Sequence, residues 1–232
     1  MNKKYLITSG CSYTSGALDQ YGWPDYLAKL MDRELDNKAE GGRGNYYISN
    51  QVYDIIDTSK YNWANSIVIV MWSGIDRVDK AVSKKEFNYF DKFNDNIQDS
   101  WLHSGGAKGF DKTKTKDRYW YNYYKTYHTE EDSYIQTLQH MIGVQEFLTN
   151  RKIPYLFLTY KDIFSNRYQK YKRAKNLENH INWDRFHFPN GEFGGEFEWV
   201  KDNNLTWSED GIHPSEESHK KYAEYLHNLK LI

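Results

Sequence analysis

The stretch that decides the fold class is Ser66-Ile67-Val68-Ile69-Val70-Met71-Trp72. Its apolar residues do not alternate with polar ones, so a strand built from them needs cover on both faces. Strands of this kind occupy the middle of parallel sheets that carry helices on both sides. The stretch therefore predicts a central strand of an α/β fold.

Further strands and helices are expected on both sides of this stretch in the sequence. Strand signals lie at Tyr5–Ser9 and Ile153–Tyr160, with a weaker one at Leu35–Ala39. Four segments have apolar residues at helical spacing, at Tyr26, Leu27, Leu30 and Met31; Ile48, Val52, Ile55 and Ile56; Ile135, Leu138, Met141, Ile142 and Leu148; and Tyr222, Tyr225, Leu226 and Leu229. Strands that alternate with helices in this way predict a parallel sheet.

The length of 232 residues predicts one domain over 1–232. Two segments, about 84–125 and 164–205, do not fit the alternation of strands and helices. Long connections in compact domains are often lids or binding loops. We therefore expect two long loops inserted into one α/β domain.

Charge and composition exclude several classes of protein. Lys plus Arg is 31 and Asp plus Glu is 32, so the net charge of −1 gives no global attraction to nucleic acid or to anionic membranes. No stretch approaches the roughly 20 apolar residues of a membrane span, and the first apolar run is too short for a signal peptide. Cys11 is the only cysteine, which excludes an internal disulfide and a zinc site built from several cysteines. We expect no metal or cofactor, and a cytoplasmic or virion-associated protein.

A serine follows the first expected strand, in Gly10-Cys11-Ser12-Tyr13-Thr14. The carboxyl ends of parallel strands are where α/β folds place their functional sites. Ser12 is therefore a candidate nucleophile. The ordinary alternative is that Ser12 only caps a helix.

A candidate acid and base precede the last expected helix, in Asp210-Gly211-Ile212-His213-Pro214-Ser215. Pro214 disfavours helical geometry at His213, which places the imidazole in the turn that enters the helix. Asp210 can hold one ring nitrogen of His213, which leaves the other free to take a proton from a hydroxyl. The alternative is a polar turn without a catalytic role.

A glycine cluster, Gly41-Gly42-Arg43-Gly44-Asn45, leads into another expected helix. Exposed backbone amides at the start of a helix suit a developing oxyanion. An ordinary tight turn is the commoner meaning of such a cluster.

Taken together, these segments resemble the SGNH (GDSL-like) hydrolase superfamily in order and spacing. The resemblance carries over to Ser12 as nucleophile, to Asp210 and His213, and to Gly42 with Asn45 close by. It implies a flavodoxin-like three-layer αβα sandwich with a central parallel sheet. It also implies hydrolysis of an ester through an acyl-serine, with a short acyl ester such as an O-acetyl group on a carbohydrate as substrate. Small SGNH-like proteins, some from phages, are similar in their G-C-S-[FY]-T start and their W-P-x-Y-L helix.

The third family block departs from its pattern. The family has G-x-N-D, whose Asn side chain donates to the oxyanion, whereas this chain reads Ser73-Gly74-Ile75-Asp76-Arg77. If Gly74 is the glycine of the block, Asp76 replaces the Asn, and an ionised carboxylate there would oppose the oxyanion. We expect Asp76 to point elsewhere, and Ser73 to be a possible hydroxyl donor. Loss of one donor costs roughly 10²–10³ in rate, so an inactive or weak virion or interaction protein is the alternative function.

Two further clusters leave partners open. The aromatic run 119–127 suits sugar stacking or simple packing. The basic and aromatic run 167–175 suits a phosphate backbone or a solvated helix face, and the neutral total charge favours the solvated face. We therefore expect a small-molecule or carbohydrate ester as partner, without a membrane or nucleic acid. Oligomer or virion assembly stays open.

Overall fold

The structure is a computed structural model, and it describes residues 3–18, 20–55, 61–81, 97–98, 101–104 and 115–230. Ile56, which we counted among the apolar positions of one helix, lies outside these ranges. So does most of the connection expected at about 84–125.

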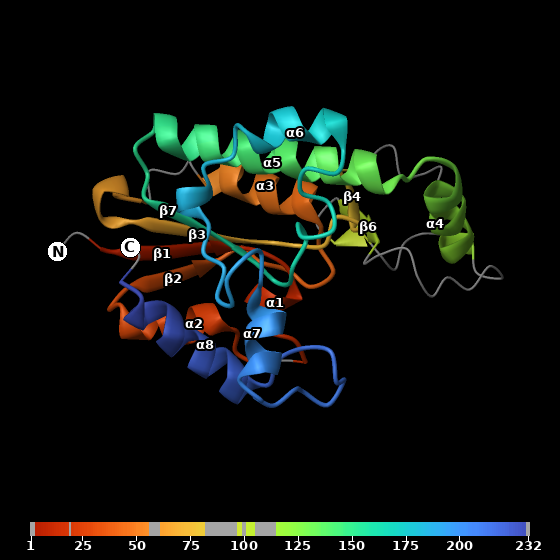
Figure 1. Ribbon diagram of the computed structural model, residues 1–232. Coiled ribbons are helices and arrows are strands. Elements are labelled where there is room, and N and C mark those ends of the chain that lie inside the picture. Colours follow the sequence, from red (N-terminus) through yellow and green to blue (C-terminus); the bar gives the residue numbers. More distant parts are fainter. Residues whose placement is uncertain are drawn as a thin grey trace.

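The core of the fold is a four-stranded parallel sheet in the order β2-β1-β3-β7 (Figure 1). Its strands are β1 (Tyr5–Ser9), β2 (Glu34–Asn37), β3 (Ile67–Trp72) and β7 (Tyr155–Thr159). Every residue of β3 is buried, because neighbouring strands pair with both of its edges and helices cover both of its faces. The central strand predicted from the apolar stretch is confirmed.

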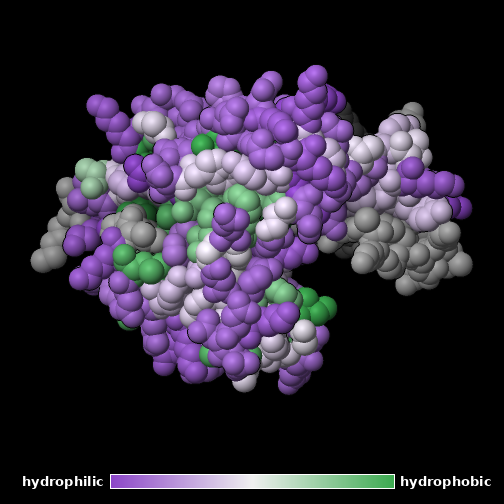
Figure 2. Space-filling view, in the orientation of Figure 1, coloured by the Kyte–Doolittle hydropathy of each residue, from purple (hydrophilic) through white to green (hydrophobic). Residues whose placement is uncertain are grey.

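Helices form one layer on each face of this sheet (Figure 1). One layer holds α2 (Trp23–Leu30), α7 (Glu196–Asp202) and α8 (Glu216–Asn228). The other holds α3 (Asn45–Ile55), α5 (Glu130–Asn150) and α6 (Lys172–Glu178). The expected three-layer αβα sandwich with a parallel sheet is confirmed, and Figure 2 shows that its helical layers turn mostly hydrophilic surface to the solvent.

The helix α2 illustrates how the sequence starts and orients these elements. Pro24 lies in its first turn, and the Asp25 carboxylate accepts the Gly22 N–H at 3.1 Å, which satisfies a donor at the helix start. Leu27 is buried, but Leu30, expected on the inner face, is 43% exposed because it is the last helical residue. No helix in the described ranges is long and apolar enough to cross a membrane.

The two segments that break the alternation contain secondary structure of their own. A second sheet, of antiparallel pairs in the order β4-β6-β5, joins β4 (Val78–Ala81), β5 (Ile97–Gln98) and β6 (Trp101–Ser104), and α4 (Thr115–Thr126) follows. The segment 164–205 holds α6, the 3₁₀ helix η4 (Trp183–Arg185) and α7. A second 3₁₀ helix, η1 (Trp63–Asn65), precedes β3. The expectation of two plain loops is therefore corrected, because buried residues such as Ala174 and Val200 pack this second segment into the core.

Candidate active site

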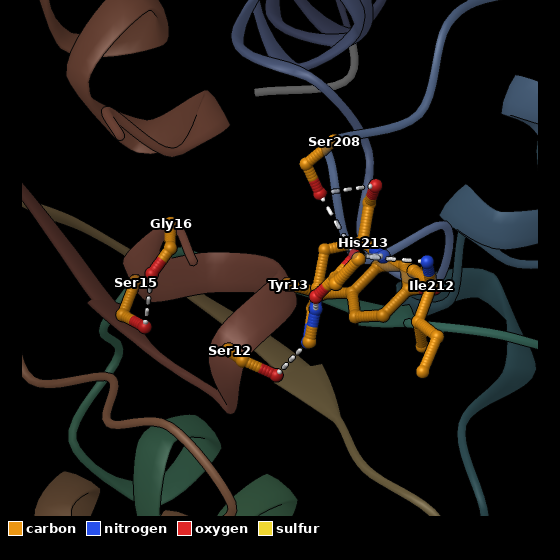
Figure 3. A network of polar contacts seen from close by, with 8 residues as sticks. Ser12, Tyr13, Ser15, Gly16, Ser208, Ile212 and His213 are labelled. Carbon is orange, nitrogen blue, oxygen red and sulfur yellow. Dashed lines mark hydrogen bonds and ion pairs between the residues drawn. The ribbon is translucent and has the colours of Figure 1, made fainter. Parts of the chain in front are cut away.

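Ser12 and His213 meet at the carboxyl edge of the parallel sheet. Ser12 is the first residue of the short helix α1 (Ser12–Ser15), which follows β1 after two residues. Its Oγ lies 2.8 Å from the His213 Nε2, although 201 positions separate the two residues in the chain (Figure 3). This is hydrogen-bond distance, and it is the arrangement in which an imidazole can take the proton of a serine hydroxyl.

Asp210 holds the other nitrogen of the same imidazole. Its Oδ2 lies 2.5 Å from the His213 Nδ1, and its Oδ1 accepts the backbone N–H groups of His213 at 3.0 Å and of Ile212 at 2.9 Å. Hydrogen bonds from the His213 backbone and ring, then from Ile212, hold the pKa of Asp210 well below its usual range. An ionised Asp210 keeps the proton on Nδ1, which leaves Nε2 to act as the base.

The loop that carries Asp210 and His213 is fastened at several points. Ser208 donates its N–H to the His213 carbonyl at 2.9 Å, and its Oγ lies 3.0 Å from the Asp210 Oδ1. Gly211 has a φ of +65°, which a side chain would strain, and its N–H donates to the Ser208 carbonyl at 2.9 Å. The acid and the base are therefore held together by the backbone of one short turn.

Tyr13 connects this turn to the serine. Its hydroxyl donates to the Ile212 carbonyl at 2.6 Å, and its ring centroid lies 5.4 Å from that of His213 (Figure 3). Burial raises the pKa of Tyr13, so the phenol stays protonated and can donate. Sequence reasoning missed both Tyr13 and Ser208. The position of Ser208, two residues before Asp210, was an available turn signal, whereas the contact between Tyr13 and Ile212 spans 199 positions and left no signal in the sequence.

Two backbone amides at this edge are unpaired in the described structure, that of Ser12 itself and that of Gly42 in the glycine loop. In the described part of the chain, neither the Ser12 N–H nor the Gly42 N–H donates a hydrogen bond. Gly42 has a φ of +78°, and a Cβ there would approach the His103 Nε2 to 3.2 Å. A Cβ on Gly41 would lie 4.0 Å from the Ser12 Cβ, so the loop runs directly beside the serine. These contacts are consistent with the oxyanion role predicted for the amides of the glycine cluster, which stays a prediction.

The small antiparallel sheet packs against the far side of this loop. The Asp79 carboxylate, on β4, accepts the N–H groups of Gly44 and Tyr47 at 2.9 and 3.1 Å, which caps the start of α3. On β6, the His103 Nδ1 lies 3.0 Å from the Arg43 Nη1. The segment that interrupts the α/β alternation thus helps to set the conformation of the glycine loop.

Asn45 does not donate toward the serine, contrary to its predicted place in an oxyanion or substrate site. Its Nδ2 donates to the Ser73 carbonyl at 3.2 Å and to the Thr137 Oγ at 3.1 Å, and its Oδ1 accepts the Ser73 N–H at 2.8 Å. All hydrogen-bonding groups of the amide are therefore engaged. Asn45 instead fastens the chain at the end of β3 to helices α3 and α5.

Ser73 and Asp76 are the other polar side chains that we predicted for that site. Ser73 is fully buried, and its Oγ has no hydrogen-bond partner within the described residues. The Asp76 carboxylate lies over Gly74, where a Cβ would come within 2.7 Å of its Oδ1, and its carbonyl accepts the Tyr124 hydroxyl at 2.6 Å. Asp76 and Arg77 lie in a turn beyond the strand, closed by the Arg77 N–H on the Gly74 carbonyl at 3.3 Å. The expectation that Asp76 does not point freely into the oxyanion site agrees with this geometry.

A polar cavity of about 300 Å³ opens beside this turn, between the ends of β3 and β7. It is lined by Gly74, Ile75, Asp76, His128, Glu130, Lys161, Asp162, Ile163 and Arg167. Of the described residues, no three or more His, Cys, Asp or Glu side chains gather as metal ligands would.

The aromatic and basic runs have ordinary structural contacts. Trp120 on α4 is 1% exposed and packs against Tyr119, Tyr123 and Tyr124, whereas Tyr127 is 73% exposed. The run 119–127 therefore includes both a buried aromatic side chain, that of Trp120, and an exposed one, that of Tyr127. In the basic run, Arg167 pairs with Glu130 at 2.8 Å, which favours a solvated, charge-paired face.

Comparison with known proteins gives a family match over almost the whole chain. The family model described as GDSL-like Lipase/Acylhydrolase matches residues 7–226. No curated protein matches significantly.

Several solved structures are similar over their full length at low sequence identity. TesA is 13% identical, with 99% of this chain and 100% of that chain covered and a TM-score of 0.53. The acetyl xylan esterase AlAXEase is 12% identical, with 97% and 99% covered and a TM-score of 0.49. A member of the lipolytic protein G-D-S-L family from Veillonella parvula DSM 2008 is 11% identical, with 98% of both chains covered and a TM-score of 0.48. The likeness to TesA shows the fold alone.

Proposed function

The chain belongs to the GDSL-like lipase/acylhydrolase family, and on this premise we propose that it is a serine esterase that cleaves short acyl esters through an acyl-serine. The observation that carries the proposal is the continuous path from the Ser12 Oγ through the His213 ring to the Asp210 carboxylate, with contacts of 2.8 and 2.5 Å. A serine beside an imidazole whose second nitrogen is held by a carboxylate is the arrangement that activates a hydroxyl for acyl transfer.

In the first half of the reaction the Ser12 Oγ attacks the ester carbonyl, and its proton passes to the His213 Nε2. The electron pair of the C=O bond moves to the carbonyl oxygen, which becomes the oxyanion. When that pair returns, the bond from the carbonyl carbon to the alcohol oxygen breaks, and His213 protonates the leaving alkoxide. Asp210 stabilises the imidazolium in between.

In the second half, water repeats the sequence on the acyl-serine. His213 takes a proton from the water as it attacks, and the collapse of the second oxyanion breaks the bond to the Ser12 Oγ, which is reprotonated. In both halves the oxyanion accepts hydrogen bonds from the Ser12 and Gly42 amides, which have no other partner in the described structure.

The substrate that we propose is an O-acyl carbohydrate, with acetyl as the acyl group. The polar cavity beside the Gly74–Asp76 turn supports this assignment, because charged side chains such as Lys161 and Asp162 can bind the hydroxyl groups of a sugar.

The test is a fluorophosphonate probe followed by peptide mapping. We expect the wild-type protein to be labelled at Ser12, with loss of labelling in Ser12→Ala. Ser15→Ala is the matched control, because Ser15 lies in the same helix and its hydroxyl bonds only to the Gly16 carbonyl. Turnover of p-nitrophenyl acetate should exceed that of the octanoate. A folded wild-type protein that takes no label would overturn the proposal and favour an inactive interaction protein.

A further inference from the structure

The oxyanion site has two free amides, but the polar side chains predicted beside it do not supply a third donor. The Asn45 amide is used by Ser73 and Thr137, and the Ser73 hydroxyl is fully buried. Asp76 is an acceptor when ionised, and it lies over Gly74. A third positive or donating group at this edge must therefore come from another residue.

The Arg77 guanidinium bridges the two loops that form the site. Its Nη1 donates to the Arg43 carbonyl at 3.2 Å, one residue after Gly42. The guanidinium also lies close enough to Cys11, one residue before Ser12, for the two groups to interact electrostatically. Its carbon lies 5.4 Å from the ring centroid of Tyr160, whose ring packs at 5.0 Å against that of Tyr13. One side chain thus contacts the backbone next to Gly42 and, through the packed rings of Tyr160 and Tyr13, reaches the residue that follows Ser12.

Arg77 forms no ion pair with any carboxylate that the structure describes. Among the described residues no carboxylate lies within 4 Å of its guanidinium, whereas the nearby Arg43 pairs with Glu40 at 2.6 Å. Although burial acts to lower the pKa of Arg77, the neighbouring Cys11, Tyr160 and Asp76 raise it above its usual value. A buried guanidinium that has no described carboxylate at ion-pair distance acts electrostatically on the adjacent site as well as on the more distant Asp76 and Asp79.

We propose that Arg77 is a positioning residue of the oxyanion hole and that its charge takes the place of the missing third-block amide. The inference rests on the proposed esterase function. Arg77 holds the glycine loop through the Arg43 carbonyl and the segment of Ser12 through the rings of Tyr160 and Tyr13, so that both amides face the same oxygen. Its positive charge also favours the negative charge that forms there in the transition state.

The experiment compares substitutions that separate charge from hydrogen bonding. Arg77→Lys keeps the charge, Arg77→Gln keeps a donor for the Arg43 carbonyl, and Arg77→Met keeps only apolar bulk. Because loss of one oxyanion donor typically costs roughly 10²–10³ in rate, we expect the second-order rate of fluorophosphonate labelling to fall in the order wild type, Lys, Gln, Met. The loss should reach about 100-fold for Arg77→Met, and ester assays should show it in kcat rather than in KM.

The matched control is Arg33→Met. Arg33 also donates to backbone carbonyls, those of Tyr5 and Asn65, but it does so at the amino edge of the same sheet. We expect this variant to lose thermal stability without a change in the labelling rate of the folded protein. Free guanidinium ion should restore part of the labelling rate of Arg77→Ala, and sodium at equal ionic strength should not.

The outcomes separate this inference from the function on which it rests. A wild-type protein that is never labelled overturns both. A labelled wild-type protein whose folded Arg77→Lys, Arg77→Gln and Arg77→Met variants react at the wild-type rate overturns the role of Arg77 and leaves the esterase. If Arg77→Met does not fold, the order of the Lys and Gln variants decides: equal rates in the two contradict the role of the charge.

Discussion

The molecule contains two carboxylate–imidazole pairs that look alike as pairs but differ in their surroundings. In one, the His213 Nδ1 lies 2.5 Å from the Asp210 Oδ2, and in the other the His219 Nδ1 lies 2.8 Å from the Glu196 Oε1. The side chains of the first pair are 21% and 27% exposed, whereas both side chains of the second are fully buried.

The surroundings give the two pairs different chemistry. The His213 Nε2 reaches the Ser12 hydroxyl, whereas the His219 Nε2 and the Glu196 Oε2 have no hydrogen-bond partner in the described structure. Hydrogen bonds from the His213 and Ile212 backbone lower the pKa of Asp210, and burial raises the pKa of Glu196. A carboxylate–histidine contact therefore suits catalysis only where a nucleophile and solvent access complete it.

The buried pair lies where two helices of one layer meet. Glu196 begins α7 and His219 lies on α8, next to the buried ring of Tyr222, which packs edge-to-face on Trp23. We interpret this pair as structural, because it joins two helices of the layer beside the loop of Asp210 and His213 and both of its side chains are fully buried. The predictions that follow test this division of roles.

The largest expected difference is in activity, between His213→Ala and His219→Ala. Loss of His213 removes the base, so esterase turnover should fall by about 10⁴-fold or more with little change in Tm. His219→Ala should lower Tm while the folded fraction keeps a labelling rate close to that of the wild type. Active-site titration combined with thermal unfolding measures both quantities. A loss of 10³-fold or more in folded His219→Ala would contradict the structural role.

The next effect concerns the stability of the buried pair. Replacing only His219 by Leu leaves an unpaired carboxylate in the core, which typically costs about 3–5 kcal/mol of unfolding free energy. Replacing Glu196 and His219 together by Leu should cost less, because no buried charge is left without its partner. Urea unfolding of the single and double variants gives the comparison. A double variant that is less stable than the single one would show that the pair stabilises this site more than apolar packing can.

The two carboxylates should also give opposite dependences of stability on pH. The pKa of Asp210 is lowered from 3.8, so its stabilisation is present above that pH and is lost as the pH falls toward the folded-state value. The pKa of Glu196 is raised from 4.5, so its contribution is present below that pH and is lost as the pH rises through the folded-state value.

Urea midpoints between pH 3 and 7 measure these slopes. The stability advantage of the wild type over Asp210→Asn should shrink toward acid pH, and its advantage over Glu196→Gln should shrink toward neutral pH. If the stability difference from the wild type changes with pH in the same direction for both variants, the opposite pKa shifts of Asp210 and Glu196 are contradicted.

The smallest effect is expected for Tyr13→Phe, which removes one hydrogen bond between the serine turn and the catalytic loop. Loss of the 2.6 Å contact to the Ile212 carbonyl should cost about 1 kcal/mol, which corresponds to a fall of about 2–4 °C in Tm. We expect kcat to fall less than tenfold, because the ring still packs beside His213. Tyr26→Phe, which removes the hydroxyl contact to Glu216 at the exposed start of α8, is a control for tyrosine hydroxyls that do not touch the site. Equal kcat in Tyr13→Phe and the wild type would show that Tyr13 does not position the loop.

The sequence predicted the four strands of the parallel sheet and the helices α2, α3, α5 and α8, because burial leaves a local pattern. The apolar run at 66–72 became β3 with every strand residue buried. The weak signal at Leu35–Ala39 corresponds to β2 at Glu34–Asn37, one residue earlier at its start, because pairing with β1 sets the limits of this polar edge strand. Leu30 was placed wrongly, since helical spacing does not show where a helix leaves the core.

Part of the site was equally visible in the sequence. Asp210 and His213 lie three residues apart, so a turn alone can join them, and the position of Ser12 after a strand follows from the α/β pattern. The sequence also indicated that the third block departs from the family pattern. It could not show that the Asn45 side chain hydrogen-bonds to the Ser73 backbone, because that contact depends on where α3 and the end of β3 come together.

The sequence by itself determined the parallel α/β fold and the identity of the residues that can form a triad, because apolar periodicity and short spacings act locally. Only the tertiary structure decided which polar groups reach the serine. Tyr13 meets Ile212 across 199 positions. Arg77 contacts the backbone next to Gly42 and the ring of Tyr160, and His219 is buried with Glu196 rather than exposed beside a hydroxyl. These outcomes depend on how strands and helices pack in three dimensions, and the free energy of a polar group depends on that packing more than on its neighbours in the chain.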